Sequence, residues 1–572
     1  MKVLDELRQT GLHDLASAVA VAVLGVPQGV AYAMVAGLPP KMGLYAAAVP
    51  AIVGSLFRSS RHVISGPTNA VSLVVGGAIL LLARQGHDPA VVAVTLAFMV
   101  GAFQLSAGLL RLGGVVDYIS GPVVLGYMTG AGVLIGVGQL PKLTHTVGAR
   151  GDLVTQLSAW IGGLGLTEPG ALALGLGTAA MVFGLRRIDE RIPGAVVVMC
   201  ASIALSFALD LPGRGFEVVR DLSPIPPSLP PLTMPQWGEM GVLVPAAMAA
   251  TVLSLVESTS VARSIAATTG DRLDANREFV GQGLSNFAAA FTGGYPVSGS
   301  LSRSALNFKA GARTRLSGVL SGVLVLVLVL LVGPVLDLTP VASLAGLLLV
   351  VAWDLMDWVR MRLTLRAGWS DGLAFVATLA GTWALELDKA IYLGVFISVA
   401  TFLRRASLLS VFEIAVDPRG RLCEVKSTGR RVYGRAERVR LLHVEGALFF
   451  GAAGELRDAL EEAMADRRVQ VLVVRLKRAR ALDVTAATVL MDASKSMQAQ
   501  GRHLLLVGMR DALMERMLRM DADRVFGKEN LFPTQDIWFA AMDQALTRAL
   551  DLAEEPEGPL RDYLAGRRAA SG

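Results

Sequence analysis

The chain has 572 residues, of which 53% are hydrophobic and only 17% are charged, and its mean hydropathy is +0.54. Soluble domains carry about a quarter charged residues, and a soluble protein this apolar would aggregate through its exposed surface. The net charge of +6 does not indicate a nucleic-acid partner, because the basic residues are distributed over short loops between apolar runs.

Apolar runs without Asp, Glu, Lys or Arg recur through the first four hundred residues. Most of them approach the roughly 20 residues that span a bilayer core. A cleaved signal peptide explains the first run poorly, because many similar runs follow it. The sequence therefore predicts an integral membrane protein. The runs are Leu15–Val35, Val63–Leu82, Val91–Leu110, Gly241–Val256, Leu316–Leu336 and Ile391–Leu403.

Lysine and arginine gather in alternate connections between these runs. If the N-terminus is placed inside, the basic connections all fall on one side, which the positive-inside tendency identifies as cytoplasmic. We expect a multi-pass protein of the cytoplasmic membrane whose N-terminus and polar C-terminal region are both cytoplasmic. The basic residues are Arg58, Arg61, Arg111, Arg186, Arg187, Arg191, Arg272, Arg277, Lys309, Arg313, Arg315, Arg360, Arg362, Arg366, Arg404 and Arg405.

Proline and glycine interrupt several of the predicted spans. Pro27 interrupts the first, Gly66-Pro67 a second, and the stretch 293–300 a third, far downstream. Unwound backbone at membrane depth is tolerated only where it lines a cavity or is buried in protein, and such breaks in corresponding halves point to a transporter's binding site. Single proline kinks also occur in ordinary spans. The proline-rich stretch Asp221–Pro235 is predicted to be an external connection between two halves.

Beyond residue 405 the charge density rises and the pattern becomes that of a soluble α/β domain. We predict a transmembrane domain over 1–405, a linker and the start of the soluble region over 406–437, an α/β domain over 438–550 and a flexible polar tail over 551–572. The domain has predicted strands at Leu441–Glu445, Val471–Leu476 and His503–Val507, and predicted helices at Gly454–Asp466 and Thr485–Gln500.

The residues that enzymes and metal sites use are sparse. Two cysteines, Cys200 and Cys423, build neither a disulfide framework nor a metal site. The six histidines form no closely spaced ligand set, and the glycine-rich stretch 293–299 lacks the spacing of a nucleophile elbow. We therefore expect a transporter rather than an enzyme, without cofactor or metal.

Four segments resemble landmarks of the sulfate permease family in the right order: Pro27–Tyr45, Ser59–Pro67, Asn276–Asn286 and Gly299–Ser304. The resemblance runs from about residue 14 to about 545, and the C-terminal region is similar to a STAS domain. It implies a polytopic α-helical protein with two inverted repeats of seven segments, arranged as a core and a gate domain and often as a homodimer. It also implies transport of small anions such as sulfate, dicarboxylates or bicarbonate, with a cytoplasmic regulator as a possible partner of the STAS domain.

The resemblance also implies where the anion binds. Two helix N-termini that face each other offer free N–H groups and about half a positive charge each, although these positions are equally typical of plain helix caps. Arg303 would supply fixed charge, unless its role is structural. Gln28 and Tyr32 lie one helical turn apart, although Tyr32 is also compatible with an interfacial anchor. The two N-termini comprise Thr68, Asn69 and Ala70, and Ser300, Leu301 and Ser302.

The hydroxyl of Thr68 stands where some family members have phenylalanine, which favours an oxyanion or small carboxylate over chloride alone. Glu257 follows an apolar run, where a carboxylate is unfavourable unless paired or protonated. It is our candidate for proton coupling, and the alternative is a structural ion pair with Arg303 or Arg263. Sodium ranks lower, because Val261 one turn on supplies no oxygen ligand.

In the STAS-like region, Thr485 resembles the position at which bacterial anti-sigma antagonists carry a phosphorylated serine. The alternative is a helix N-cap. For the whole chain we predict a secondary active anion transporter, by proton symport or anion exchange, with an elevator-like or rocking movement. The alternatives are an anion channel or voltage-responsive motor, and a nucleobase-type permease on a similar architecture.

Overall fold

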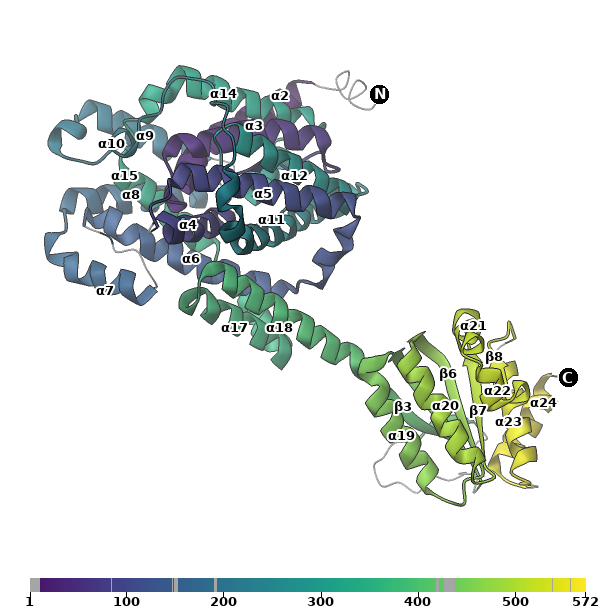
Figure 1. The fold of residues 1–572 in the computed structure, drawn as a ribbon. Coiled ribbons are helices and arrows are strands. Elements are labelled where there is room, and N and C mark those ends of the chain that lie inside the picture. The colour runs from purple at the N-terminus through teal and green to yellow at the C-terminus, as the bar shows by residue number, and fades with distance from the viewer. Residues whose placement is uncertain are drawn as a thin grey trace. The chain divides into compact units, whose positions relative to one another are not determined.

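The computed structural model describes residues 11–83, 85–146, 148, 153–189, 193–417, 421–425, 438–537, 539–555 and 557–571. The chain folds as two units, 1–399 and 400–572 (Figure 1). The boundary between the units falls inside helix α18 (Leu387–Ser407), which ends two residues beyond the predicted end of the transmembrane domain at residue 405. The N-terminal stretch 1–10, which we predicted to be cytoplasmic, lies outside the described residues.

The first half of unit 1 places seven segments in order, one of which is the short strand β1 followed by α4. They are α2 (Leu12–Val35), α3 (Pro40–Phe57), β1 (Ser65–Gly66) with α4 (Asn69–Ala83), α5 (Pro89–Leu109), α6 (Gly121–Thr144), α8 (Pro169–Ile188) and α9 (Gly194–Ala208). The connecting elements are η1 (Leu112–Tyr118), α7 (Leu153–Gly163), η2 (Leu164–Leu166), η3 (Pro212–Arg214) and α10 (Val219–Leu222).

The second half repeats this order, again with a strand before its third helix. Its segments are α11 (Met240–Thr269), α12 (Ala275–Phe291), β2 (Ser298–Gly299) with α13 (Leu301–Lys309), α14 (Leu316–Leu336), α15 (Val341–Asp354), α17 (Trp369–Ala384) and α18. The remaining elements are η4 (Trp237–Glu239) and α16 (Trp358–Ala367). Among the described residues, eight helical segments are long and apolar enough to cross a membrane, one of which, Val341–Ala367, combines α15 with α16. Helices α4 and α9 are shorter apolar helices.

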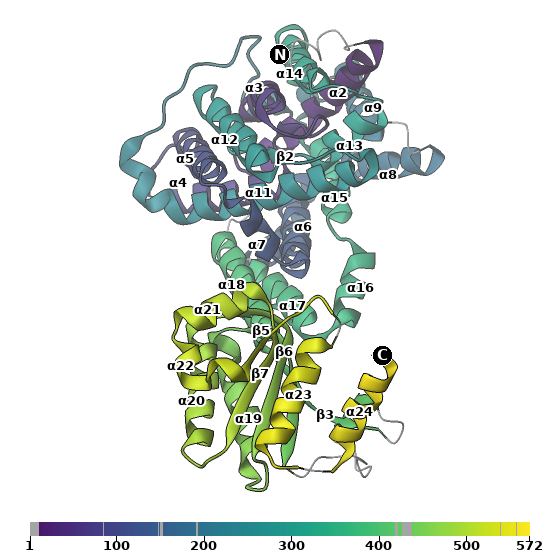
Figure 2. The ribbon, with the colours of Figure 1, turned by 90° about the vertical axis from the view of Figure 1, so that its right-hand side faces the viewer.

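The packing pairs of the two halves correspond to each other (Figure 2). Helix α14 packs on α2 and α3, and its counterpart α5 packs on α11 and α12, the counterparts of α2 and α3. In the same way, α15 packs on α8 and α6 packs on α17. Exchanging the halves therefore preserves the contacts, which confirms the predicted pair of repeats. The helices form two bundles, one containing α2–α5 and α11–α14 and the other containing α6, α8, α15 and α17.

The predicted interruption at Pro27 is wrong. Helix α2 is continuous from Leu12 to Val35, with Pro27 inside it. Proline removes one backbone donor and tends to kink a helix, but in membranes the neighbouring helices and local adjustments satisfy the freed groups. The glycine–proline sequences at residues 66–67 and 293–300 do break their segments, because there the chain forms β1 and β2.

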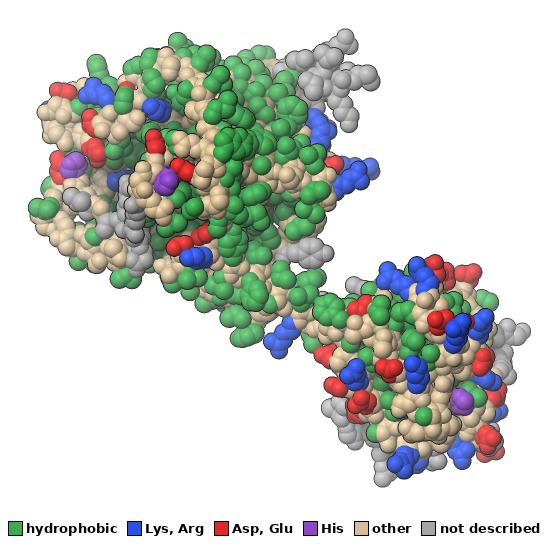
Figure 3. All heavy atoms as spheres, viewed as in Figure 1, with side chains coloured by type: hydrophobic (Ala, Val, Ile, Leu, Met, Phe, Trp, Pro, Cys, Tyr) green, Lys and Arg blue, Asp and Glu red, His purple; other side chains and the backbone are tan. Residues whose placement is uncertain are grey.

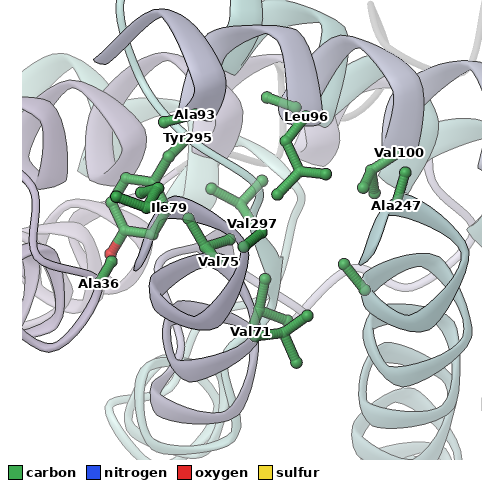
Figure 4. Packing of buried hydrophobic residues seen from close by; sticks show 14 of the residues in the cluster. Ala36, Val71, Val75, Ile79, Ala93, Leu96, Val100, Ala247, Tyr295 and Val297 are labelled. Carbon is green, nitrogen blue, oxygen red and sulfur yellow. The ribbon is translucent and has the colours of Figure 1, made fainter. Parts of the chain in front are cut away.

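Small and branched apolar side chains form the interior of the first bundle (Figure 4). Val71, Val75 and Ile79 come from α4, and Tyr295 and Val297 from the stretch that leads to β2. Close helix contact depends on glycine: a Cβ placed on Gly29 of α2 would lie 2.8 Å from the carbonyl oxygen of Gly43 in α3. Small residues at such contacts let helix backbones approach in the membrane.

On the face of unit 1 that Figure 3 shows, apolar side chains cover large areas and charged side chains are few. Large apolar side chains stand exposed on its long helices, such as Leu331 at 74% on α14 and Phe396 at 71% on α18. Contiguous exposed apolar surface of this extent is not found on soluble monomers. It is the expected lipid-facing surface of a membrane protein. Unit 2, in contrast, mixes acidic and basic side chains over its surface.

Unit 2 contains a six-stranded sheet in the order β4-β3-β5-β6-β7-β8. Strands β5 to β8 are parallel, and β3 pairs antiparallel with β4 and β5. Apolar clusters cover both faces, one with α19 to α22 and one with α23 and α24. The strands are β3 (Ser410–Val416), β4 (Leu422–Glu424), β5 (Val439–Leu448), β6 (Val471–Leu482), β7 (His503–Met509) and β8 (Leu531–Pro533). The helices are α19 (Ala453–Ala465), α20 (Val484–Gln498), α21 (Asp511–Arg519), α22 (Ala522–Phe526), α23 (Ala540–Leu552) and α24 (Pro559–Ser571), with η5 (Phe450–Ala452) and η6 (Lys528–Asn530).

The stretch 406–437, predicted as a linker and the start of the soluble region, contributes β3 and β4 to the sheet, and part of it lies outside the described residues. Two other expectations for this region need correction. The tail was predicted to fray, but α24 buries Leu560, Tyr563 and Leu564 in the cluster that includes α23, because these few apolar residues share one helix face. Thr485 does not cap α20, since the side chain of Asp483 accepts the bond from the Ala486 N–H at 2.9 Å.

Candidate functional site

Two strands from the two repeats cross in the middle of the first bundle. Ser65 pairs with Gly299 and Gly66 with Ser298, and the Ser300 N–H donates to the Ile64 carbonyl oxygen at 2.9 Å. Each strand leads directly into a helix, β1 into α4 and β2 into α13. Because the strands are antiparallel, the two helices leave the crossing in opposite directions with their N-termini close together. The structure thus has the arrangement of half-helices that the sequence predicted.

The first turns of both helices carry free backbone donors, as all helix N-termini do. The Ser300 side chain caps α13 by accepting from the Arg303 N–H at 3.4 Å, and Asn69 accepts from the Ala70 N–H at 2.9 Å. The capping interpretation is therefore correct for Ser300. Leu301 and Ser302 remain exposed, whereas Ala70 is buried. The start of α13 is thus the more accessible of the two N-termini.

Arg303 lies over the strand crossing. Its side chain is only 2% exposed, and one terminal nitrogen donates to the Pro67 carbonyl oxygen at 2.6 Å. A Cβ added to Gly66 would lie 2.7 Å from the guanidinium carbon, so glycine is what lets the cation rest against β1. The Nε of Arg303 has no protein partner in the described part of the chain. A buried positive charge thus joins the two positive helix ends at one place.

Helix α2 brings a polar and an aromatic side chain to the same site. Gln28 donates from Nε2 to the Ser302 hydroxyl at 3.3 Å, and Ser302 lies 3.4 Å from the Ser300 hydroxyl. Tyr32 follows one turn later and is 6% exposed. Its burial within the bundle argues against an interfacial anchor. The structure therefore places Gln28, Tyr32, Ser302 and Arg303 around the start of α13, as the sequence predicted.

Glu257 on α11 faces the start of α4. The Thr68 hydroxyl donates to Glu257 Oε2 at 3.0 Å, so in this structure that hydroxyl is already engaged. Among the described residues Glu257 makes no ion pair within 4 Å, so the partner that the structure gives its side chain is the Thr68 hydroxyl. Glu257 is partly buried and lies in the middle of α11, beside the start of α4.

A buried polar network, which the sequence did not reveal, holds the extended backbone at Val297, directly before β2. Asn286 of α12 accepts from the Val297 N–H at 2.8 Å and donates to the Val297 carbonyl oxygen at 3.1 Å. Gln282, one turn earlier, donates to the same carbonyl at 2.8 Å. Gln104 and Ser254 extend this network from α5 and α11. The extended backbone at membrane depth thereby finds partners for its polar groups.

A charged pair holds β1 in the same way. Arg58 donates to the Ser65 hydroxyl and, at 2.7 Å, to Gln282 Oε1, and its ion pair with Glu278 spans 3.9 Å. Glu278 in turn accepts from the Ser60 N–H. Arg58 and Glu278 are 0% and 1% exposed. The signal in the sequence was their place within or beside the segments 59–67 and 276–286, but no spacing rule pairs residues more than 200 positions apart.

Comparison with known proteins agrees with this architecture. The profile described as the sulfate permease family matches residues 12–378, and that of the STAS domain matches residues 432–536. "Probable sulfate transporter MT1781" of Mycobacterium tuberculosis is 30% identical over 397 residues, which cover 69% of this chain and 70% of the relative. "Sulfate transporter 2.2" of Arabidopsis thaliana is 26% identical over 558 residues, covering 91% of this chain and 81% of the relative.

Two solved structures share the fold. The murine Solute Carrier 26 family member A9 anion transporter in the inward-facing state superposes with a TM-score of 0.87 at 19% identity, over 96% of this chain and 94% of that chain. The transmembrane domain of a cyanobacterium bicarbonate transporter, BicA, gives a TM-score of 0.59 at 24% identity, over 68% of this chain and 97% of that chain. With the family profile covering well over half of its residues, the chain belongs to the sulfate permease family of transporters and carries a C-terminal STAS domain.

Proposed function

We propose that this anion transporter is a secondary active carrier for small oxyanions or carboxylates, of the sulfate, C4-dicarboxylate or bicarbonate class. The observation that carries the proposal is the convergence of two helix N-termini and the buried Arg303 at one strand crossing. An anion there would replace its hydration shell with backbone N–H groups and the Ser302 hydroxyl. Helix dipoles and a fixed cation would offset the cost of moving its charge into the membrane.

The proposed binding residues are those that surround the crossing. Ser300, Leu301, Ser302 and Arg303 would contact the anion from α13, and Gln28 and Tyr32 from α2. Thr68, Asn69 and Ala70 would contribute the start of α4, with the Thr68 hydroxyl released from Glu257 when the anion binds. The hydroxyl and carboxamide groups in this set favour oxygen-rich anions, which accept several hydrogen bonds at once.

We further propose that Glu257 couples transport to protons. It approaches the anion site through Thr68 and lacks a basic partner within 4 Å among the described residues. A carboxylate there repels an incoming anion, so protonation and anion binding favour each other. This reciprocity is the thermodynamic requirement for symport. Alternating access would follow from movement of one bundle against the other, in an assembly that we propose to be a homodimer in the cytoplasmic membrane.

The STAS domain is proposed to be cytoplasmic and to receive a regulator. Thr485 lies exposed in the first turn of α20, where its hydroxyl is accessible to a kinase and where the helix dipole would favour an added phosphate. The neighbouring Asp483 caps the same helix and would oppose that charge. Phosphorylation would therefore perturb the cap rather than simply stabilise the helix.

Uptake into proteoliposomes tests the transport proposal. Radiolabelled sulfate, fumarate, succinate and bicarbonate are offered with and without an inward proton gradient. We expect accumulation of at least one anion above equilibrium, which a channel cannot produce. Ser302→Ala should weaken the apparent affinity of the transporter for that anion roughly tenfold, the effect of one hydrogen bond to a charged group. The matched control Ser158→Ala, on the exposed α7, should leave the affinity unchanged. Unchanged affinity in Ser302→Ala would contradict the site assignment.

Glu257→Gln tests the coupling separately. We expect exchange of the anion across the membrane to continue while gradient-driven accumulation disappears, because glutamine mimics the protonated side chain but cannot release the proton. Glu239→Gln, a change of the same kind outside the site, should leave accumulation intact. Gradient-driven accumulation that persists in Glu257→Gln would remove the coupling role but leave the binding site unaffected.

A further inference from the structure

Helix α16 joins the membrane segments α15 and α17 but does not span the membrane itself. Its ten residues, Trp358–Ala367, extend over about 15 Å, half of a bilayer core. Counting segments along the chain places it on the same side as the connections from α3 to β1 and from α13 to α14. Because α15 ends at Asp354 and α17 begins at Trp369, both ends of α16 are held at the level of the membrane surface.

The helix has no buried residue, although six of its ten side chains are apolar. Val359 is 70% exposed, Leu363 61%, Leu365 54% and Trp358 51%. The partly buried Met361 and Thr364 mark the side that lies against the protein. Exposed apolar side chains in this density require a cover, and at the level of the membrane surface that cover is lipid.

Two arginines lie within this apolar surface. Arg362 and Arg366 stand four residues apart, so they point the same way from one ridge of the helix, which also includes Trp358. Both are exposed, and neither makes an ion pair with any residue that the structure describes. Arg360, in contrast, pairs with Asp357 at 3.2 Å. The two unpaired cations have the spacing to bind one phosphate together or two neighbouring phosphates.

Tryptophans frame this pair of arginines. Trp358 lies at one end of α16 and packs near Trp353, with ring centroids 5.8 Å apart. Trp369 follows the other end and is 75% exposed. Tryptophan concentrates at the level of lipid headgroups, where its ring is buried and its N–H is hydrated. The aromatic residues thus indicate the same depth as the ends of α15 and α17.

We propose that α16 is an interfacial helix that binds the phosphates of anionic phospholipids through Arg362 and Arg366. Its apolar side chains enter the acyl boundary while the two guanidinium groups extend to the headgroups. The planar fork of arginine bonds phosphate through two N–H groups at once. Lipid is favoured over an acidic protein because the helix is continuous with membrane-spanning segments on both sides.

The test uses the full chain in nanodiscs of phosphatidylcholine with increasing phosphatidylglycerol. Bound phosphatidylglycerol is counted by native mass spectrometry, and the thermal midpoint is measured in parallel. Each lysine or arginine near a charged membrane surface contributes about fivefold in affinity, so R362Q/R366Q should weaken phosphatidylglycerol binding roughly 30-fold. R362K/R366K should retain most of it. The matched control R519Q/R524Q removes the same charge from exposed positions of unit 2.

Three outcomes would overturn the proposal: unchanged lipid binding in R362Q/R366Q, an equal loss in R519Q/R524Q, or a loss that accompanies a change in oligomeric state. The last would show that a second copy covers α16. Inorganic phosphate at the same concentration should not raise the thermal midpoint, because the proposal requires the acyl chains as well as the headgroup. All variants must match the wild-type midpoint in pure phosphatidylcholine, which separates lipid recognition from folding. None of these measurements depends on the transported anion.

Discussion

At the scale of single residues, the proposed anion site depends on small side chains as much as on charged ones. Arg303 can lie against β1 only because Gly66 has no Cβ, and a Cβ added to Gly299 of β2 would lie 2.8 Å from the Ser258 hydroxyl of α11. Glycine is thus required here for close approach and not for unusual torsion angles. The position of the Arg303 guanidinium therefore depends on the absence of a side chain at Gly66 in β1.

Gly66→Ala should therefore impair anion binding without removing any binding group. The new methyl group would overlap the buried guanidinium and displace it, so we expect a loss of roughly tenfold to hundredfold in anion affinity, the range for a hydrogen bond to a charged group. Radiolabelled-anion binding to the purified protein measures it. Gly114→Ala, where no atom lies within 4 Å of the added carbon, is the control. Equal affinities in the two variants would show that Arg303 does not touch the anion.

A second residue-scale prediction concerns His443 in the STAS sheet. It is 3% exposed, and burial, reinforced by Arg475, lowers the pKa of its imidazole, although Glu445 at 3.0 Å opposes this. The folded domain therefore disfavours the imidazolium form. Its contribution to stability is complete above the unfolded pKa of about 6.5 and is lost as the pH falls below it, by at most about 1.4 kcal/mol per pH unit.

Hydrogen exchange of β5 in the full chain at pH 7.5 and 5.5 checks this. Protection should fall at the lower pH in the wild type and change less in His443→Gln. His503→Gln, in strand β7 on the far side of β6, serves as the comparison. A wild-type pH response that persists unchanged in His443→Gln would assign the effect to another group.

At the scale of elements, the sequence predicted what depends on composition and missed what depends on pairing. Hydropathy located α2, α5 and α14, and the glycine–proline breaks located β1 and β2. The sequence analysis wrongly predicted an interruption at Pro27. A rule based on local sequence does not include the neighbouring helices, which can satisfy the backbone carbonyl that loses its hydrogen bond to the proline. It left out the network around Asn286 and Arg58, whose partners come from distant segments and meet only after the repeats have packed.

Asn286→Leu tests that network. The change leaves the Val297 N–H and the Gln104 amide oxygen buried without partners, at about 1–3 kcal/mol each. We expect a clear drop in the thermal midpoint of the detergent-solubilised protein and a loss of transport. Gln85→Leu, at an exposed loop position, should change neither. A normal midpoint in Asn286→Leu would mean that water replaces the lost bonds.

At the scale of the whole molecule, two units with separate hydrophobic clusters share one chain. Urea solvates the core of a water-soluble domain as it unfolds, whereas helices in a membrane environment satisfy their backbone groups internally. We expect hydrogen-exchange protection of β5 to β7 to disappear at lower urea concentration than that of α5 and α12. A single transition for all of these segments would instead show that the units unfold together.

The crossing of β1 and β2 has one more consequence. Each strand comes from a different repeat, so neither repeat alone can form the pair of strands and the two facing helix N-termini. A chain severed within the proline-rich connection at 223–235 should yield two inactive fragments, and co-expression should restore activity only if they reassemble around this shared pair of strands. The two repeats therefore act as complementary subunits joined in one chain, and the smallest functional unit includes both of them.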